Sequence, residues 1–240
     1  MIKNENVVIV YSNKKAAEIL SLFVKQAEFH VTSKNTKFII ITNDREIDID
    51  SKLNFHYSFY EETEPFYMHM VNALNDEHSD YFYYMQDDFL FYDEFNFEDN
   101  KILSDLKKYS KEGYSFIKAE PGRFNKKEWK EYLHLDENET YFLSYQPTLW
   151  NRKIFLDIMK KSKVTSIRHE YESCCGVFGE IFREMKYKGL GAKEGRLIPV
   201  IEAIHMGKWR SFKSNPQDLE RLHKIHEKNN INPTIRGFKK

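Results

Sequence analysis

The chain is poor in cysteine, glycine and proline, with 2 Cys, 9 Gly and 6 Pro among its 240 residues. The two cysteines, Cys174 and Cys175, are adjacent, and adjacent cysteines rarely pair because a disulfide requires separated Cα atoms. No CxxC motif and no Cys/His spacing typical of a zinc site occurs. We therefore interpret both cysteines as small apolar residues of a helix. Free thiols are typical of a reducing compartment, which predicts a cytoplasmic protein.

Long apolar runs and an excess of one charge are also missing. No run approaches 18 apolar residues, so we expect no membrane-spanning helix. The amino-terminal residues contain no apolar stretch long enough for a secretory signal. Lys plus Arg and Asp plus Glu each total 37, which gives zero net charge and no sign of bulk electrostatic binding to nucleic acid. The length allows one large domain or two small ones.

The most informative stretch runs from Tyr81 to Phe95, with the sequence YFYYMQDDFLFYDEF. Its first five residues are apolar or aromatic without a break, which predicts a strand buried on both faces, as in a parallel sheet. Asp87 and Asp88 follow Gln86 where this strand should end. Adjacent carboxylates repel one another unless a cation or hydrogen bonds compensate, and open α/β sheets bind ligands at the carboxyl ends of strands. This stretch alone favours a metal with a polyphosphate ligand about as much as an acidic surface turn.

The amino-terminal half of the chain has the pattern β-α-β-β-α-β. The predicted strands cover residues 7–11, 38–41, 54–59 and 81–85, and the predicted helices cover 16–27 and 64–78. The first strand, helix and second strand form a βαβ unit, which implies a parallel strand pair with a right-handed crossover. The residues that end these two strands fall on the side where a nucleotide would bind, although each alone is more simply a turn or helix cap. These residues are Tyr11, Ser12, Asn13, Asn43 and Asp44.

The carboxy-terminal half alternates less regularly. We predict helices over 98–111, 152–161, 173–187 and 217–229, strands over 114–118, 141–145 and 198–204, and a polar loop over 121–139. Gly113 is the expected cap of the first of these helices, and Gly189 and Gly191 should break the third. No internal repeat or linker is visible. We expect one domain over 1–213, followed over 214–240 by a charged helix and a basic tail that could contact a membrane surface peripherally.

Read in order, these pieces resemble the nucleotide-diphospho-sugar transferase superfamily, which has the glycosyltransferase type A fold. The strand ending in QDDF, the QPTLW segment, the acidic HEYE segment before a helix and the late GKW match motifs of small bacterial and viral glycosyltransferases of polysaccharide biosynthesis. The likeness spans about Val7 to Trp209. It implies an α/β fold with a Rossmann-like, mostly parallel central sheet flanked by helices. It also implies sugar transfer from a nucleotide-diphosphate sugar to a hydroxyl of a glycan or lipid-linked glycan acceptor.

The resemblance further implies a Mn²⁺ or Mg²⁺ ion that assists departure of the diphosphate. Asp88 would be its first ligand, with Asp87 as a second candidate, and His205 at the end of the last strand as a late ligand. A histidine that only caps a strand is about as common. Gln86 then occupies the first position of the acidic motif, where it could bind a ribose or sugar hydroxyl. Lys208 would neutralise the pyrophosphate.

The acceptor side of the reaction is assigned by the same resemblance. Gln146 and Trp150 would bind the acceptor, although a single Trp, like Trp209 later in the chain, more often lies in a core. An inverting transferase needs a general base for the acceptor hydroxyl. Glu172 is the first candidate and Glu170 the second, and a surface ion pair is the alternative role for Glu170.

Three alternatives stay open. A sugar nucleotidyltransferase of the same fold normally carries a glycine-rich basic loop after the first strand, and here the loop YSNKKAAE has no glycine. A degenerate nucleotide-sugar-binding protein without turnover is compatible with Gln86 in the acidic motif. A metal-dependent phosphoesterase usually needs more His and Asp ligands than one acidic pair.

Overall fold

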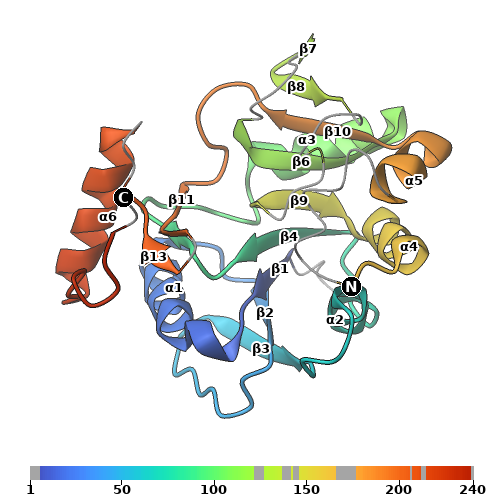
Figure 1. Cartoon of the computed structure of the whole chain (residues 1–240). Helices are drawn as coiled ribbons and strands as arrows, with labels where there is room; N and C mark the ends of the chain where they lie inside the picture. The colour runs from blue at the N-terminus through green and yellow to red at the C-terminus, as the bar shows by residue number, and fades with distance from the viewer. Residues whose placement is uncertain are drawn as a thin grey trace.

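The structure, a computed structural model, describes residues 6–121, 127–136, 142, 146–165, 177–205, 207–211 and 215–238. Over these residues the chain forms one mixed β-sheet with helices on both faces (Figure 1). The strands of this sheet are β1 (Asn6–Tyr11), β2 (Thr36–Thr42), β3 (Asn54–Phe59), β4 (Tyr81–Gln86), β6 (Tyr114–Pro121), β7 (Lys127–Trp129), β8 (Tyr132–Leu135), β9 (Thr148–Asn151) and β10 (Lys188–Ala192).

Helices and small ribbons complete the described elements. The helices are η1 (Lys14–Ala16), α1 (Ala17–His30), α2 (Phe66–Leu74), α3 (Lys101–Tyr109), η2 (Ser110–Glu112), α4 (Arg152–Ser162), α5 (Val177–Met185) and α6 (Pro216–Lys228). Two two-stranded ribbons pair β5 (Phe89–Phe91) with β11 (Val200–Glu202) and β12 (Ile204–His205) with β13 (Lys208–Trp209). None of the described helices combines the length and apolar character that a bilayer crossing requires.

The order of strands in the sheet is β3-β2-β1-β4-β9-β6-β10-β8-β7. Strands β3, β2, β1 and β4 are parallel, as are β6 and β10. Strand β9 is antiparallel between β4 and β6, and the β7–β8 hairpin extends the sheet beyond β10 in antiparallel fashion. The predicted parallel pair β1–β2 is confirmed, whereas the whole sheet is mixed because β9 and the hairpin run against their neighbours.

The direction in which strands are added reverses next to β1. The chain passes from β1 to β2 and β3 on one side and then returns to place β4 on the other side. Such a reversal is a topological switch point, and in open α/β sheets the crevice at the carboxyl ends of the two strands is where ligands bind. The carboxyl ends of β1 and β4 are therefore the first place to look for a site.

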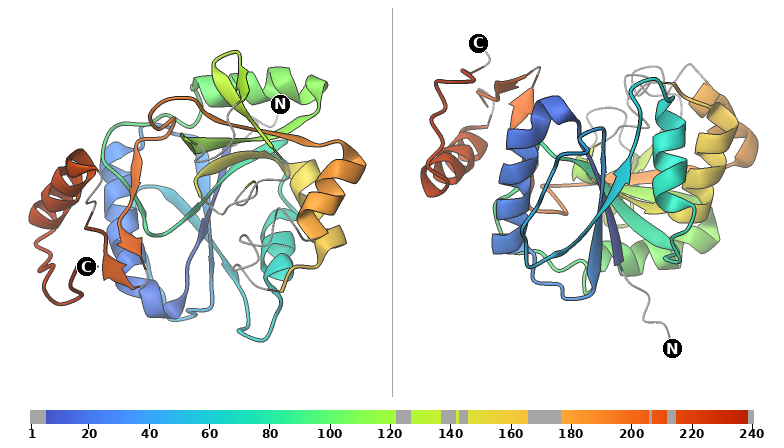
Figure 2. Two further views of the ribbon diagram at one scale, coloured as in Figure 1. Left: turned by 45° about the horizontal axis from the view of Figure 1, so that its top comes forward. Right: turned by 90° about the horizontal axis from the view of Figure 1, so that it is seen from below.

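The central strands are buried on both faces, as predicted for residues 81–85. Phe82 to Met85 are each at most 1% exposed. Tyr83 and Met85 belong to a cluster with residues of α1, α3 and α6, and Phe82 and Tyr84 to a second cluster with residues of α2, α4 and α5. The right panel of Figure 2 shows α1 on one face of the sheet and α2 and α4 on the other, with α6 outside α1.

Two glycines expected to end a helix lie instead inside strand β10. A Cβ atom on Gly189 would lie 2.2 Å from Cζ of Phe116, whose ring comes from the neighbouring strand β6. The glycine is therefore required by a close approach between strands, a reason that is invisible in the local sequence. The polar segment 121–139 also contains more structure than the predicted loop, because β7 and β8 lie within it and Tyr132 and Leu133 are buried.

The last predicted strand is divided in the structure. Val200 to Glu202 pair with β5, and Ile204–His205 form a hairpin with Lys208–Trp209, closed by Gly207 at φ 76°. The predicted strand over 141–145 lies outside the described residues except for Phe142. The cysteine pair and the first residues of the helix predicted over 173–187 also lie outside the described part.

The carboxy-terminal helix α6 matches its predicted range closely and packs on the domain. Leu222 and Ile225 join the buried cluster that also contains α1 residues. At its first turn Asp218, 1% exposed, accepts two hydrogen bonds from Arg196 at 2.6 and 2.8 Å. The segment that follows Arg196 contains β11 and the β12–β13 hairpin, so this buried ion pair ties α6 to the strands next to the switch point.

Candidate functional site at the carboxyl ends of β1 and β4

Ser12 and Asp87 join the two strands of the switch point. The Ser12 Oγ donates to Oδ2 of Asp87 at 2.5 Å, and both residues are buried. The backbone continues the pairing, because Asp87 N donates to the carbonyl of Tyr11 at 3.2 Å and Ser12 N to that of Ile41 at 2.9 Å. The structure thus brings together two residues, Ser12 and Asp87, that the sequence placed at the ends of separate strands.

An aromatic group supports this junction from the side of α2. The hydroxyl of Tyr60 donates to the carbonyl of Ser12 at 3.2 Å, and the hydroxyl of Tyr11 lies 3.0 Å from Nδ1 of His69. The Tyr60 and His69 rings stack with centroids 4.0 Å apart. Burial lowers the pKa of His69, so the ring is held neutral beside the tyrosines. Neither Tyr60 nor His69 was identified from the sequence, because helix α2 reaches this edge only through the tertiary fold.

The other predicted nucleotide-side residues form hydrogen bonds within and between the loops of this edge. Asn13 caps η1 by accepting from the Lys15 amide at 3.0 Å, and Asn43 accepts from the Lys14 amide at 2.7 Å. Asp44 is 7% exposed and accepts from the Glu46 amide at 3.2 Å. These three residues lie at the predicted edge. Asn13 and Asp44 make turn and cap contacts, whereas Asn43 joins separate loops, because its Nδ2 also donates to Glu62 at 2.9 Å.

Asp88 occupies the tight turn between β4 and β5 and meets a segment more than a hundred residues later in the chain. Its carbonyl accepts from the Ala203 amide at 2.7 Å, and the Ala203 carbonyl accepts from the Arg210 amide at 2.9 Å. The Oδ1 atom of Asp88 is buried and has no hydrogen-bond partner in the described structure. An unpartnered buried carboxylate oxygen is costly and marks a place where a cation or a donor is expected.

The two adjacent carboxyl groups hold their protons more tightly than usual. Burial raises the pKa of Asp87 to about 7, opposed by hydrogen bonds from Ser12 and from the backbone amides of the turn. The pKa of Asp88 is raised well above its ordinary value by burial and by the negative charges of Asp87 and Glu202, and lowered by Arg210. The charged forms of both carboxyl groups are therefore disfavoured in the metal-free chain, and a bound cation would favour them.

Glu202 and Arg210 belong to this site and were not identified from the sequence. Arg210 lies 3.1 Å from Oε2 of Glu202 in a partly buried ion pair, and Nδ1 of His205 lies 3.4 Å from the other carboxylate oxygen. The predicted late ligand His205 is thus next to Glu202. The signal in the sequence was a glutamate inside an otherwise apolar strand, Val200–Glu202, and an arginine directly after GKW.

Lys208 and Trp209 have different environments on the β13 strand. Lys208 is exposed opposite His205, whereas Trp209 is 3% exposed and packs edge-on against His226 of α6 at 4.3 Å. Stacking of the Trp209 ring on a sugar or base is therefore not favoured by its burial. Trp150 is likewise 3% exposed, between the rings of Phe116 and Phe155, and forms part of the core.

The remaining predicted residues divide into those the structure describes and those it does not. Gln86 ends β4 in register with Tyr11 and is partly exposed at the switch point. Gln146 precedes β9, and its carbonyl accepts from the Thr148 hydroxyl at 2.8 Å. Both candidates for the general base, Glu170 and Glu172, lie outside the described residues.

A divalent cation fits the chemistry of this edge without a complete protein cage. Within the part of the chain that is described, no group of three or more His, Cys, Asp or Glu side chains is arranged to hold a metal. Mg²⁺ bound with nucleotides normally takes one or two carboxylates and completes its coordination with phosphate oxygens and water. The Oδ1 atom of Asp88, buried and without a hydrogen-bond partner among the described residues, is of the chemical type that such an ion uses.

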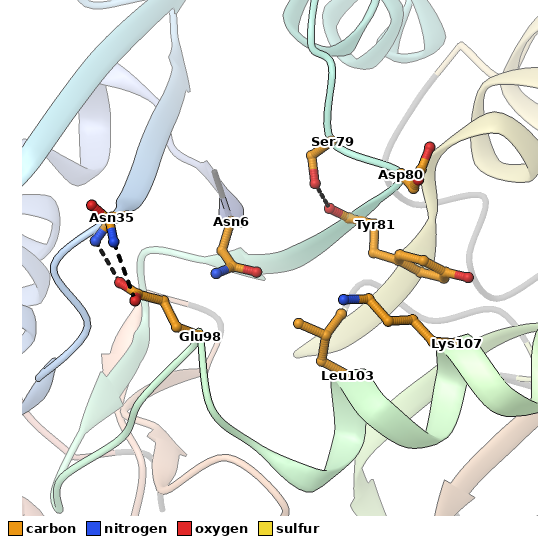
Figure 3. A pocket seen from close by; sticks show the side chains of 8 residues that line it. All are labelled: Asn6, Asn35, Ser79, Asp80, Tyr81, Glu98, Leu103 and Lys107. Atoms are coloured by element: carbon orange, nitrogen blue, oxygen red, sulfur yellow. Dashed lines mark hydrogen bonds between the residues drawn. The ribbon is translucent and has the colours of Figure 1, made fainter. Parts of the chain in front are cut away.

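A pocket of about 290 Å³ lies at the opposite edge of the sheet (Figure 3). Asn6 and Tyr81, the first residues of β1 and β4, line it, so it opens at the amino ends of the parallel strands. In Figure 3 Lys107 extends from α3 toward Tyr81, and Glu98 accepts from Asn35. Amino ends are not where open α/β sheets bind their ligands. This pocket is therefore a less favourable place for a nucleotide than the carboxyl edge.

Comparison with known proteins gives no independent identification. The sequence matches no protein-family model, and no curated protein matches it significantly. The functional assignment therefore depends on the geometry of the switch-point edge.

Proposed function

We propose that the protein is a glycosyltransferase of the type A fold that binds a nucleotide-diphosphate sugar at the carboxyl ends of β1 and β4. The acceptor would be a hydroxyl of a glycan or lipid-linked glycan in surface polysaccharide or glycoconjugate synthesis. The order β3-β2-β1-β4, with its switch point at β1 and β4, supports a nucleotide-binding half of Rossmann type. The type A fold is thus proposed as the specific fold to which the observed mixed α/β sheet belongs.

One observation carries the proposal. At the switch point Asp88 presents a buried carboxylate oxygen that has no hydrogen-bond partner among the described residues, under the electrostatic influence of Asp87 and Glu202. Structural acids of a core are normally paired or hydrogen-bonded. An acid left in this state at the ligand edge of an α/β sheet is expected of a group that holds a cation and its phosphate ligand.

Each residue of the site has a role in this proposal. Ser12 holds the Asp87 carboxyl group by a 2.5 Å hydrogen bond and so sets the geometry of the turn that presents Asp88. Asp88 would hold the metal, which when bound supplies Lewis-acid stabilisation of the diphosphate leaving group. Gln86 at the end of β4 would bind a ribose or sugar hydroxyl, and Lys208 remains a candidate for the diphosphate. Deprotonation of the acceptor stays assigned to Glu172, with Glu170 as second candidate.

The test is turnover of a panel of UDP-, GDP-, dTDP- and CMP-sugars with Mn²⁺. Turnover is measured as the release of free nucleotide. We expect turnover of at least one sugar nucleotide, abolished by EDTA and reduced at least about 100-fold in Asp88→Asn, because a metal contributes several kcal/mol to the transition state. Asp93→Asn, the same change at an exposed acid of the next loop, serves as the control.

The other outcomes separate the alternatives. Metal-dependent binding without turnover of any sugar would instead favour a nucleotide-sugar-binding protein. Formation of a sugar nucleotide from a sugar phosphate and a nucleoside triphosphate would favour the nucleotidyltransferase. Undiminished turnover in Asp88→Asn with EDTA present would contradict the role of the acidic pair.

A further inference from the structure

The backbone places Arg210 beside the acidic turn with little freedom. Ala203 donates its amide to the Asp88 carbonyl at 2.7 Å, and Arg210 donates its amide to the Ala203 carbonyl at 2.9 Å. Between Ala203 and Arg210 the chain forms the β12–β13 hairpin, and Trp209 N donates to the Gly237 carbonyl at 3.0 Å, which ties the hairpin to the carboxy-terminal segment. The position of Arg210 is thus set by main-chain hydrogen bonds from both directions.

The guanidinium of Arg210 is paired with the carboxylate of Glu202. It forms an ion pair of 3.1 Å with Glu202, and both side chains are partly buried, at 27% and 20% exposure. Its main chain is linked to the carbonyl of Asp88 through the two hydrogen bonds of Ala203. In the ligand-free chain Arg210 therefore supplies positive charge where the acidic group needs it, which is the electrostatic role that a bound metal would otherwise have.

A metal and Arg210 would then compete for the same negative charge. A divalent cation at Asp88 would be repelled by a guanidinium held on Glu202, and it would satisfy the carboxylates in its place. An arginine displaced from a carboxylate is well suited to phosphate, because its planar fork of N–H donors matches two phosphate oxygens. Lys208, exposed on the same hairpin, offers only a point charge.

We infer that Arg210 binds the diphosphate and that its ion pair with Glu202 keeps it from doing so in the absence of metal. When a metal is bound, Arg210 would leave Glu202 and contact the diphosphate. The inference deepens the proposed function and rests on it. It assigns to Glu202 the role of a positioning residue that makes nucleotide binding depend on metal. Without metal Glu202 retains the arginine in its ion pair. With metal the arginine becomes available at the same place.

The test is calorimetric titration of the full chain with UDP, GDP and dTDP, each compared with its nucleoside, with and without Mn²⁺. Arg210→Gln should weaken binding of the diphosphate at least about tenfold, the scale of one charge-assisted contact, and leave nucleoside binding unchanged. Glu202→Gln should release Arg210, so that the ratio of affinities with and without Mn²⁺ falls at least about tenfold.

Arg210→Gln should lower the affinity for the diphosphate, whereas Glu202→Gln should raise the affinity measured without metal. A general loss of folding cannot produce both results. Glu220→Gln and Lys224→Gln, which break an exposed ion pair on α6, are the matched controls and should change neither quantity. If the wild-type chain binds a diphosphate and Arg210→Gln binds it equally well, or Glu202→Gln keeps full metal dependence, the inference is wrong while the proposed function stands. If the wild-type chain binds none of the three diphosphates with Mn²⁺, both are wrong.

Discussion

Asp87 shows how a single carboxyl group reports on the environment of the switch point. It is 7% exposed, and burial raises its pKa to about 7 although Ser12 donates to it. A folded-state pKa above the unfolded value means that the folded chain binds more protons between about pH 4 and pH 7. Over that window the contribution of Asp87 to the free energy of unfolding decreases as the pH rises, and above it the contribution stays constant.

We therefore predict a pH-dependent effect of Asp87→Asn on the free energy of unfolding of the metal-free protein. Relative to the wild type, the variant should be more stable at pH 8 than it is at pH 4.5. The relative gain should be about 3 kcal/mol, because about 2.5 pH units of the window lie above pH 4.5 and each corresponds to about 1.4 kcal/mol. Urea unfolding in EDTA at both pH values measures it, and Asp93→Asn at an exposed position is the control. Equal pH slopes for Asp87→Asn and the wild type would show that Asp87 ionises normally.

Part of the site could be predicted at the scale of residues, and the reason is local. Ser12, Gln86, Asp87 and Asp88 follow apolar runs whose burial is evident in the sequence, so their place at strand ends was recognisable. The contribution of a residue such as Glu202 depends on a long-range ladder between β5 and β11. No local pattern encodes which turn such a residue will meet, and Arg210, Tyr60 and His69 were missed for the same reason.

Helix α6 illustrates the same limit at the scale of elements. The charged pattern with apolar residues at helical spacing predicts residues 217–229, and the helix covers Pro216–Lys228. The sequence did not predict that this helix would bury His226 to 3% exposure against Trp209. Neither ring nitrogen of His226 has a hydrogen-bond partner in the described structure, and burial lowers its pKa to about 4.

We predict that His226→Leu protects the protein against mild acid. Below about pH 6.5 the unfolded chain protonates its histidine while the folded chain does not until about pH 4, so the wild type loses stability as the pH falls through this window. The advantage of His226→Leu should increase on going from pH 7.5 to pH 4.5 by on the order of 3 kcal/mol. His78→Leu, at an exposed histidine in the loop before β4, should show no such increase in thermal or urea unfolding. Parallel pH profiles for His226→Leu and the wild type would exclude this role for His226.

At the scale of the whole molecule, the sheet combines a part that the sequence predicts with a part that it does not. The parallel half β3-β2-β1-β4 follows from alternating strands and helices, whose neighbours in sequence are neighbours in space. Strand β9 enters between β4 and β6 from later in the chain, and the β7–β8 hairpin covers the edge of β10. Such insertions depend on which edge remains available after the first strands have paired, and this is a property of the whole fold.

The same topology concentrates the charged residues of the site at one edge of the molecule. Three separate parts of the chain meet there, the end of β1, the turn after β4 and the segment around β11 to β13. The pocket lined by Lys107 and Tyr81 lies at the other edge. A metal and a nucleotide bound at one edge would lie far from the other edge. Direct observation of where they bind therefore distinguishes the two candidate sites.

The most direct measurement is the anomalous scattering of Mn²⁺ in crystals of the full chain grown with a nucleoside diphosphate that stabilises it in a thermal-shift panel. We expect one manganese peak within about 2.5 Å of a carboxylate oxygen of Asp88, with the diphosphate on the same ion between the ends of β1 and β4. Manganese and nucleotide in the pocket beside Lys107, or a nucleotide bound at the carboxyl edge with no metal at Asp88, would contradict it.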